Sequence, residues 1–157
     1  MTEVAADAGA IWFIDNLVRV RVSGDETGGR LCLVECLAPR GHMPPLHIHH
    51  AEDEAFVVLE GEITLYVGDN VYALAAGESA LGPKGVAHTF RVESATARWL
   101  VACAPAGFER FVAVVGEPAP EPVLPPELVL PSPERFEEIC REFGIELLGP
   151  PGTLPAA

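Results

Sequence analysis

Short segments that alternate apolar and polar residues, separated by glycine turns, run to about residue 104 and constrain the fold most. Successive side chains of a strand point to opposite faces, so each such segment buries one face. The turns are short and no helical period lies between the segments, which favours an antiparallel β-sandwich or barrel. We therefore expect an all-β domain whose strands lie at 11–14, 17–22, 30–38, 54–60, 62–68, 89–93 and 97–104.

Two amphipathic helices are expected after this β region. The first lies near 107–115, with Gly116 placed to end it. The second has Ser132 as its N-cap and Pro133 at its first position, and Gly144 follows its end. The apolar residues that recur at helical spacing are Phe108, Phe111, Val112 and Val115 in the first helix and Phe136, Ile139, Cys140 and Phe143 in the second.

The chain is expected to divide into three parts: a β-barrel domain at 1–116, a linker at 117–132, and a C-terminal helix with its tail at 133–157. Six prolines among the sixteen linker residues block both helix and central strand, so the linker should be extended and semi-rigid. Each helix needs a surface for its apolar stripe, which the barrel exterior or a partner subunit would supply. A homodimer is the expected assembly.

Charge and composition exclude several classes of protein. A formal net charge of −13, without any cluster of Lys or Arg, argues against nucleic acid and anionic membrane surfaces as partners. The apolar runs are far shorter than the roughly 20 residues of a membrane span. No secretory signal is visible, and the four cysteines form no C-x-x-C pair. We expect reduced, structural thiols in a cytoplasmic protein, a redox or nucleophilic role being the alternative.

The informative chemistry lies between residues 41 and 88. His47 and His49 are two residues apart, so in a strand both imidazoles face one point. Glu54 comes an odd number of residues after His49, so a bend at 50–53 must redirect it to the same point. His88 precedes a strand that can return antiparallel beside the first histidines. Three imidazoles and a carboxylate form a ligand set for one divalent first-row metal, namely Fe, Mn, Co, Ni, Cu or Zn, with positions left open for a substrate.

Neighbouring residues receive weaker assignments. Residues on the same side of the strand as a ligand are expected to line a substrate pocket, although each also suits the barrel core: Phe56, Val58, Phe90 and Val92. Packing or surface positions are expected for three other candidates for substrate contact: Arg91, Arg98 and Trp99. The remaining histidines, His42 and His50, are expected to be bystanders. Glu52 and Asp53 are expected in a solvated turn, with Asp53 as an alternative orienting group for a ligand.

Two motifs resemble those of the cupin superfamily. Gly41-x5-His47-x-His49-x4-Glu54-x6-Gly61 matches the first cupin motif, and Gly77-x5-Pro83-x-Gly85-x2-His88 matches the second. Val92 departs from the second motif, in which asparagine is usual at that place. The segment from Pro45 to Glu62 is similar to the quercetin 2,3-dioxygenase-like single-domain cupins. This resemblance implies a jelly-roll β-sandwich with a metal held by His47, His49, Glu54 and His88.

The resemblance implies a metal-dependent dioxygenase that acts on a small substrate with adjacent hydroxyl and carbonyl oxygens, such as a flavonol or a diketone. Glu54 would be the catalytic base that accepts the proton of the substrate hydroxyl. Two alternatives remain open at this point. One is another metal-dependent cupin enzyme, an isomerase, lyase or decarboxylase, and the other is a protein that binds a metal or small ligand without turnover.

Overall fold

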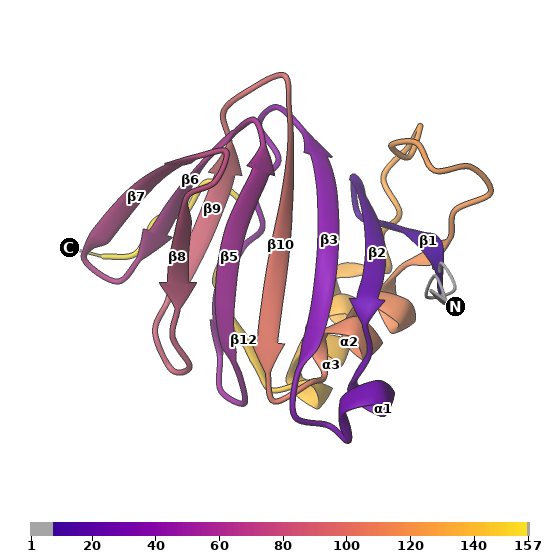
Figure 1. Cartoon of the computed structure of the whole chain (residues 1–157). Helices are drawn as coiled ribbons and strands as arrows, with labels where there is room; N and C mark the ends of the chain where they lie inside the picture. The colour runs from indigo at the N-terminus through magenta and orange to yellow at the C-terminus, as the bar shows by residue number, and fades with distance from the viewer. Residues whose placement is uncertain (1–7, 157) are drawn as a thin grey trace.

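Two antiparallel β-sheets face each other in the computed structural model, which describes residues 8–156 (Figure 1). The larger sheet has seven strands in the order β11 (Glu117–Pro118), β1 (Ala8–Phe13), β2 (Asn16–Val22), β3 (Cys32–Pro39), β10 (Thr96–Ala104), β5 (Asp53–Glu60) and β8 (Ser79–Gly82). The smaller sheet has five strands in the order β12 (Ile145–Gly149), β4 (Leu46–His49), β9 (His88–Val92), β6 (Glu62–Val67) and β7 (Asn70–Ala75). The sequence-based expectation of a jelly-roll β-sandwich is confirmed.

The core lies between the sheets and follows from the alternation in the sequence. In β3, every second residue from Cys32 to Ala38 is buried, and in β10 every second residue from Ala97 to Cys103 is buried. The two strands pair along their whole length, so their inward side chains form one continuous apolar surface. Strands β7, β8 and β12 were not predicted. In β7 only Leu74 is buried, so that strand lacks a clear hydrophobic face.

Three helices complete the fold: α1 (Gly24–Thr27), α2 (Phe108–Val115) and α3 (Pro133–Glu142). The hydroxyl of Ser132 accepts from the amide of Arg135 at 3.3 Å, so the expected N-cap of α3 is confirmed. Gly116 ends α2 as expected and has an extended backbone with φ of −86°. A Cβ atom there would lie 2.6 Å from the side chain of Ile11, so close packing requires this glycine. No helix within residues 8–156 has the length and hydropathy needed to cross a bilayer.

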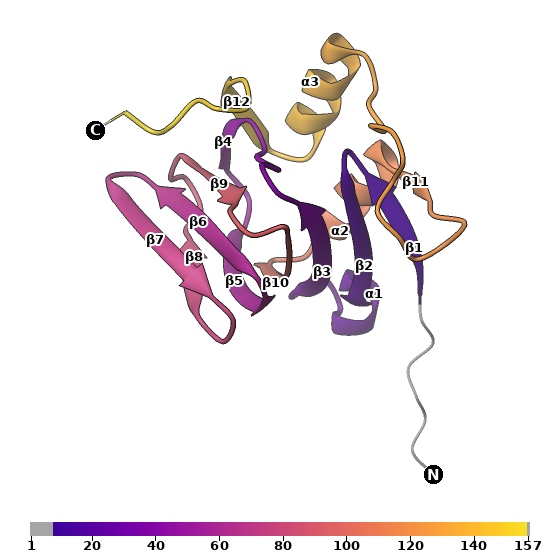
Figure 2. The ribbon, with the colours of Figure 1, turned by 90° about the horizontal axis from the view of Figure 1, so that it is seen from above.

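The proline-rich segment lies along the edge of the larger sheet. β11 pairs with β1, the indole of Trp12 donates to the carbonyl of Val123 at 2.8 Å, and the amide of Val129 donates to Ile14 at 3.0 Å. The segment therefore covers part of an edge strand that would otherwise expose unpaired backbone groups. Helices α2 and α3, which follow β10 and the proline-rich segment, lie side by side in Figure 2 between β1 and β12.

The apolar stripe of each helix is buried within the chain. Phe111 and Val112 of α2 and Ile139 and Cys140 of α3 are all buried. The helices pack on each other and on β1, β3 and β12, so they close one end of the sandwich. The stripes therefore give no argument for a partner subunit, although they were part of the basis, with the linker, for the expected homodimer.

Two glycines with similar positive φ differ in how closely they are packed, so substituting each one separates the cost of packing from the cost of the backbone conformation. Gly61 and Gly77 have φ of 79° and 88°, but only Gly61 is crowded, because its Cβ would lie 2.4 Å from the carbonyl oxygen of Thr96. Gly77→Ala should lower the free energy of unfolding by about 1 kcal/mol, the cost of the left-handed backbone. Gly61→Ala adds a steric clash and should cost about 3 kcal/mol. Equal losses in urea denaturation would contradict this packing.

Candidate metal centre

The four predicted ligand residues meet where the two sheets face each other. His47 and His49 lie on β4 and His88 on β9, and His47 pairs directly with His88 in the smaller sheet. Glu54 lies on β5 of the larger sheet. The bend at 50–52 carries the chain from one sheet to the other and turns the carboxylate back toward the histidines. The structure thus brings together residues that are up to 41 positions apart in the sequence.

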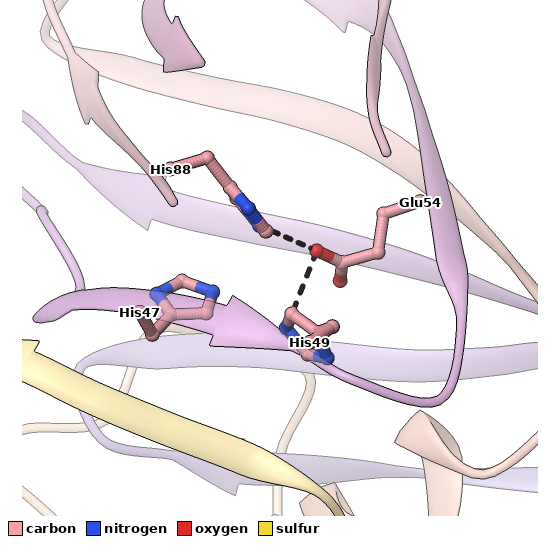
Figure 3. A group of neighbouring side chains, drawn as sticks. All are labelled: His47, His49, Glu54 and His88. Carbon is pink, nitrogen blue, oxygen red and sulfur yellow. Dashed lines mark hydrogen bonds and ion pairs between the residues drawn. The ribbon is translucent and has the colours of Figure 1, made fainter. Parts of the chain in front are cut away.

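Ligand atoms of these four residues all lie within 4.8 Å of one another. Oε2 of Glu54 lies 2.7 Å from Nε2 of His88 and 3.3 Å from Nε2 of His49 (Figure 3). Glu54, His49 and His88 are buried, and His47 is the most accessible of the four. The arrangement is a compact set of three nitrogens and one oxygen that could hold a metal ion and that is accessible on the side of His47.

Each imidazole is oriented by a hydrogen bond from its outer nitrogen. Nδ1 of His47 lies 2.7 Å from the carbonyl of Pro45, and Nδ1 of His88 lies 3.0 Å from that of Val86. A carbonyl only accepts, so in both rings Nδ1 must carry the hydrogen. Nδ1 of His49 lies 2.7 Å from the carboxylate of Glu52 and donates in the same way. In the neutral rings, therefore, all three Nε2 lone pairs point to the common centre, as a metal site requires.

Burial and mutual charge shift the pKa values of the cluster. Burial, together with repulsion from His88 and His49, lowers the pKa of His47 to about 3, so this ring is neutral at physiological pH. Burial opposes ionisation of Glu54, but attraction to His49 and His88 prevails and lowers its pKa to about 2. Burial also disfavours protonation of His49, yet the carboxylates of Glu54 and Glu52 raise its pKa above 6.5.

Glu52 departs from its sequence-based assignment. It was expected in a solvated turn, but its side chain is buried and orients His49. The bend after β4 folds the chain back on itself, so the residue three positions after His49 reaches that ring. Asp53, the alternative orienting group, instead accepts from the backbone amide of Lys84 at 2.8 Å. His50 is exposed and lies 2.7 Å from Glu146, outside the centre, as expected of a bystander.

The four cysteines are free and buried. Cys103 lies opposite Glu54 in the pairing of β10 with β5, and its thiol is 3.9 Å from Oε1 of that carboxylate. A hydrogen bond with Cys32 and burial raise the pKa of Cys103 well above its usual range. The thiol therefore stays protonated and donates weakly to Glu54.

A largely apolar cavity, partly open to solvent, begins at the metal centre. His47, His49 and Glu54 line one part of it. Of the four residues predicted to line a substrate pocket, Phe56 and Phe90 line this cavity, whereas Val58 and Val92 are not among the lining residues in the described part of the chain. These valines are two residues farther along β5 and β9 and are buried in the core, where Val58 faces Trp99 and Val92 faces Ile63 in strand pairing.

Several lining residues were not predicted. They come from the C-terminal helices, which place aromatic rings over the end of the sandwich: Phe108, Phe111 and Phe136. The helical spacing of these residues was recognised, but it identifies a buried face without identifying what that face covers. His42, expected to be a bystander, and Trp99, assigned to packing, both line the cavity. Arg91 and Arg98 instead form surface ion pairs with Glu93 and Glu60.

Comparisons with known proteins agree with this architecture. Residues 33–103 match the family model described as the cupin domain. The chain is similar to quercetin 2,3-dioxygenase of Bacillus subtilis, with 27% identity over 129 residues that cover 82% of this chain and 37% of that protein. The chain thus spans well under half the length of this relative.

Two solved structures resemble the fold. A cupin-2 domain protein of Rhodospirillum rubrum superposes with a TM-score of 0.51 at 22% identity and covers 66% of each chain. A cupin-superfamily sugar phosphate isomerase of Silicibacter pomeroyi superposes with a TM-score of 0.55 at 19% identity, over 66% of this chain and 75% of that one. Likeness at these identities shows the fold. With the cupin-domain match and both motifs set on two facing sheets, residues 33–103 of this chain form a cupin domain.

Proposed function

We propose that this protein is a metal-dependent dioxygenase that acts on a small aromatic substrate with adjacent hydroxyl and carbonyl oxygens, such as a flavonol. The observation that carries the proposal is the position of the three-histidine, one-glutamate cluster at one end of an apolar, aromatic-lined cavity. The similarity to a quercetin 2,3-dioxygenase over most of this chain supports it.

His47, His49, Glu54 and His88 would hold the metal. Their donor set fits a first-row divalent ion better than calcium or magnesium, because nitrogen predominates. When bound, such an ion supplies Lewis-acid activation of the substrate oxygens and, if it is redox-active, chemistry with dioxygen. The hydrogen bonds of Pro45, Glu52 and Val86 keep the rings in the orientation that this role requires.

Glu54 would accept the proton that the substrate hydroxyl loses. Its low pKa keeps it ionised at neutral pH, and a carboxylate of that pKa takes a proton only from a hydroxyl that has become strongly acidic. Glu54 belongs to the same cluster as the three imidazoles. The base would therefore stand beside the ion that would make the substrate hydroxyl acidic. The aromatic walls exclude water and suit a flat apolar body.

Oxygen uptake tests the proposal. Protein loaded separately with Fe, Mn, Co, Ni, Cu or Zn should consume dioxygen when a flavonol or a diketone is added, with at least one redox-active metal and not with zinc, which has no redox chemistry. Glu54→Gln should lower the rate at least about 100-fold, because the base is lost. His50→Gln, which alters an exposed histidine outside the centre, should leave the rate unchanged.

Absence of oxygen uptake with every metal and both substrate types would refute the dioxygenase. Consumption of a substrate without oxygen uptake would instead indicate an isomerase, lyase or decarboxylase. Tight ligand binding without any turnover would indicate a binding protein.

The ligand set is tested by removing one imidazole. His88→Ala should weaken metal binding more than the roughly 10- to 100-fold that loss of an orienting residue costs, because a direct ligand is removed. His50→Ala is the matched control and should bind metal as the native protein does. Unchanged affinity and stoichiometry in His88→Ala, measured by metal titration, would exclude His88 as a ligand.

Metal affinity should fall as pH decreases through the raised pKa of His49. A metal binds only the unprotonated ring, and a pKa above 6.5 means that protons compete at a higher pH than for an ordinary histidine. Glu52→Gln removes one of the two carboxylates that raise this pKa, so the fall should move to lower pH. Metal titrations from pH 5 to 8 would measure both curves. Because one proton competes with the metal, the affinity should fall by at most about tenfold for each pH unit. Superimposable profiles would contradict the role of Glu52.

A further inference from the structure

The cavity has a second polar region, formed by residues outside the metal centre. His42 is buried, and its Nδ1 lies 2.6 Å from the carboxylate of Asp15. Its Nε2 lies 3.4 Å from the amide nitrogen of Asn16. Nδ1 therefore donates to Asp15, and Nε2 of the neutral ring accepts from Asn16. These contacts use the amide nitrogen of Asn16 and leave its amide oxygen without a hydrogen-bond donor within residues 8–156.

Two buried polar atoms beside His42 have no hydrogen-bond partner within residues 8–156. They are Oδ1 of Asn16 and Nε1 of Trp99. Asn16 is 4% exposed and Trp99 is 1% exposed, and both residues line the cavity. Buried polar groups are nearly always satisfied, so an unpaired acceptor and an unpaired donor on two residues that line the same cavity point to a partner that reaches them from that cavity.

A strained turn presents this polar region. Ile14, between β1 and β2, has φ of 62°, a left-handed conformation that β-branched residues rarely adopt. The turn places Asp15 and Asn16 directly after it, within reach of the His42 ring. Strain of this kind persists where surrounding contacts impose it and is concentrated at functional sites.

Aromatic rings separate the polar region from the metal centre. The ring of His42 lies 5.5 Å from that of Phe90, Phe90 lies 5.8 Å from Phe56, and Phe56 lies 6.5 Å from His88, each measured between ring centroids. Trp99 packs against both His42 and Phe90, at 6.3 and 5.2 Å. A ligand that reaches both ends must therefore have an apolar body with a polar group at each end.

We propose that Asn16 and Trp99, supported by the Asp15–His42 pair, form a subsite for a hydroxyl group at the end of the substrate remote from the metal. A hydroxyl is the small neutral group that both donates and accepts, so it satisfies the oxygen of Asn16 and the N–H of Trp99. Because the cavity walls are aromatic, the group that carries this hydroxyl is expected to be an aromatic ring, so the hydroxyl is a phenol. The inference rests on the proposed function in one respect, since it takes the cavity as the substrate site.

Two flavonols with the same metal-binding end test this subsite. 3-Hydroxyflavone lacks a remote hydroxyl, and its 4′-hydroxy derivative carries one. With zinc-loaded protein, which holds the ligand without redox turnover, the 4′-hydroxy compound should bind about tenfold more tightly, as two hydrogen bonds to buried groups would require. Absorbance titration of each flavonol gives the two dissociation constants.

Variants locate the preference. Asn16→Leu keeps the size of the side chain but removes the acceptor, and Trp99→Phe keeps an aromatic ring but removes the donor. Each removes one of the two hydrogen bonds and should reduce the tenfold ratio to about threefold. His50→Gln is the matched control, because His50 is also paired with a carboxylate but lies outside the cavity. Its ratio should remain tenfold.

Equal dissociation constants for the two flavonols in the native protein, or binding of neither, would overturn the subsite; this comparison needs no variant to fold. Its outcome is separable from that of the dioxygenase proposal. A tenfold ratio without oxygen uptake under any metal would refute the dioxygenase and support the subsite. Oxygen uptake with equal dissociation constants would support the dioxygenase and refute the subsite.

Discussion

The contact between Glu54 of one sheet and the histidines of the other is the interaction on which the functional end of this fold depends. A carboxylate that is 4% exposed is costly to bury unless a positive or hydrogen-bonding partner compensates it. Here the partners, His49 and His88, come from the opposite sheet, and each compensates the carboxylate when its Nε2 carries a hydrogen or when a metal ion lies between them. The spacing of the sheets at this end is therefore set by a polar cluster, whereas elsewhere between the sheets it is set by apolar packing.

Much of this cluster was predictable because its determinants are local. Two histidines separated by one residue must share a face of a strand, and the odd spacing to Glu54 requires the bend that the structure contains. Glu52 was misassigned because it lies inside this bend. Inside the bend, strand alternation no longer applies, and contact three residues apart governs instead, so an acidic residue at that distance from His49 was a usable signal.

The walls of the cavity were much less predictable, because they depend on contacts between distant parts of the chain. The helical spacing around Phe111 and Phe136 predicts an apolar stripe but is equally compatible with a barrel exterior, a partner subunit or the cavity that it covers. Strand β12 joins the smaller sheet beside β4, and this pairing places α3 over the opening. Alternation along β5 also treats Phe56 and Val58 alike, although only the first lies near the cavity.

The candidate metal ligands and several of the other residues that line the cavity come from different parts of the sequence. The candidate metal ligands stand within the two motifs that define the family, on strands whose geometry the sandwich imposes. Other residues lie outside residues 33–103, the part that matches the cupin domain: Asp15 on the β1–β2 turn, Asn16 at the start of β2, and the rings carried by α2 and α3. Under the proposed function, the motifs therefore supply the metal ligands, while part of the wall that would contact a substrate comes from outside the matched residues. The segments outside the match build the aromatic cavity together with Phe56, Phe90 and Trp99, which lie inside the matched part. Within residues 8–156 the cavity residues include one unpaired acceptor, on Asn16, and one unpaired donor, on Trp99, and this pair describes the proposed ligand more closely than the motifs do.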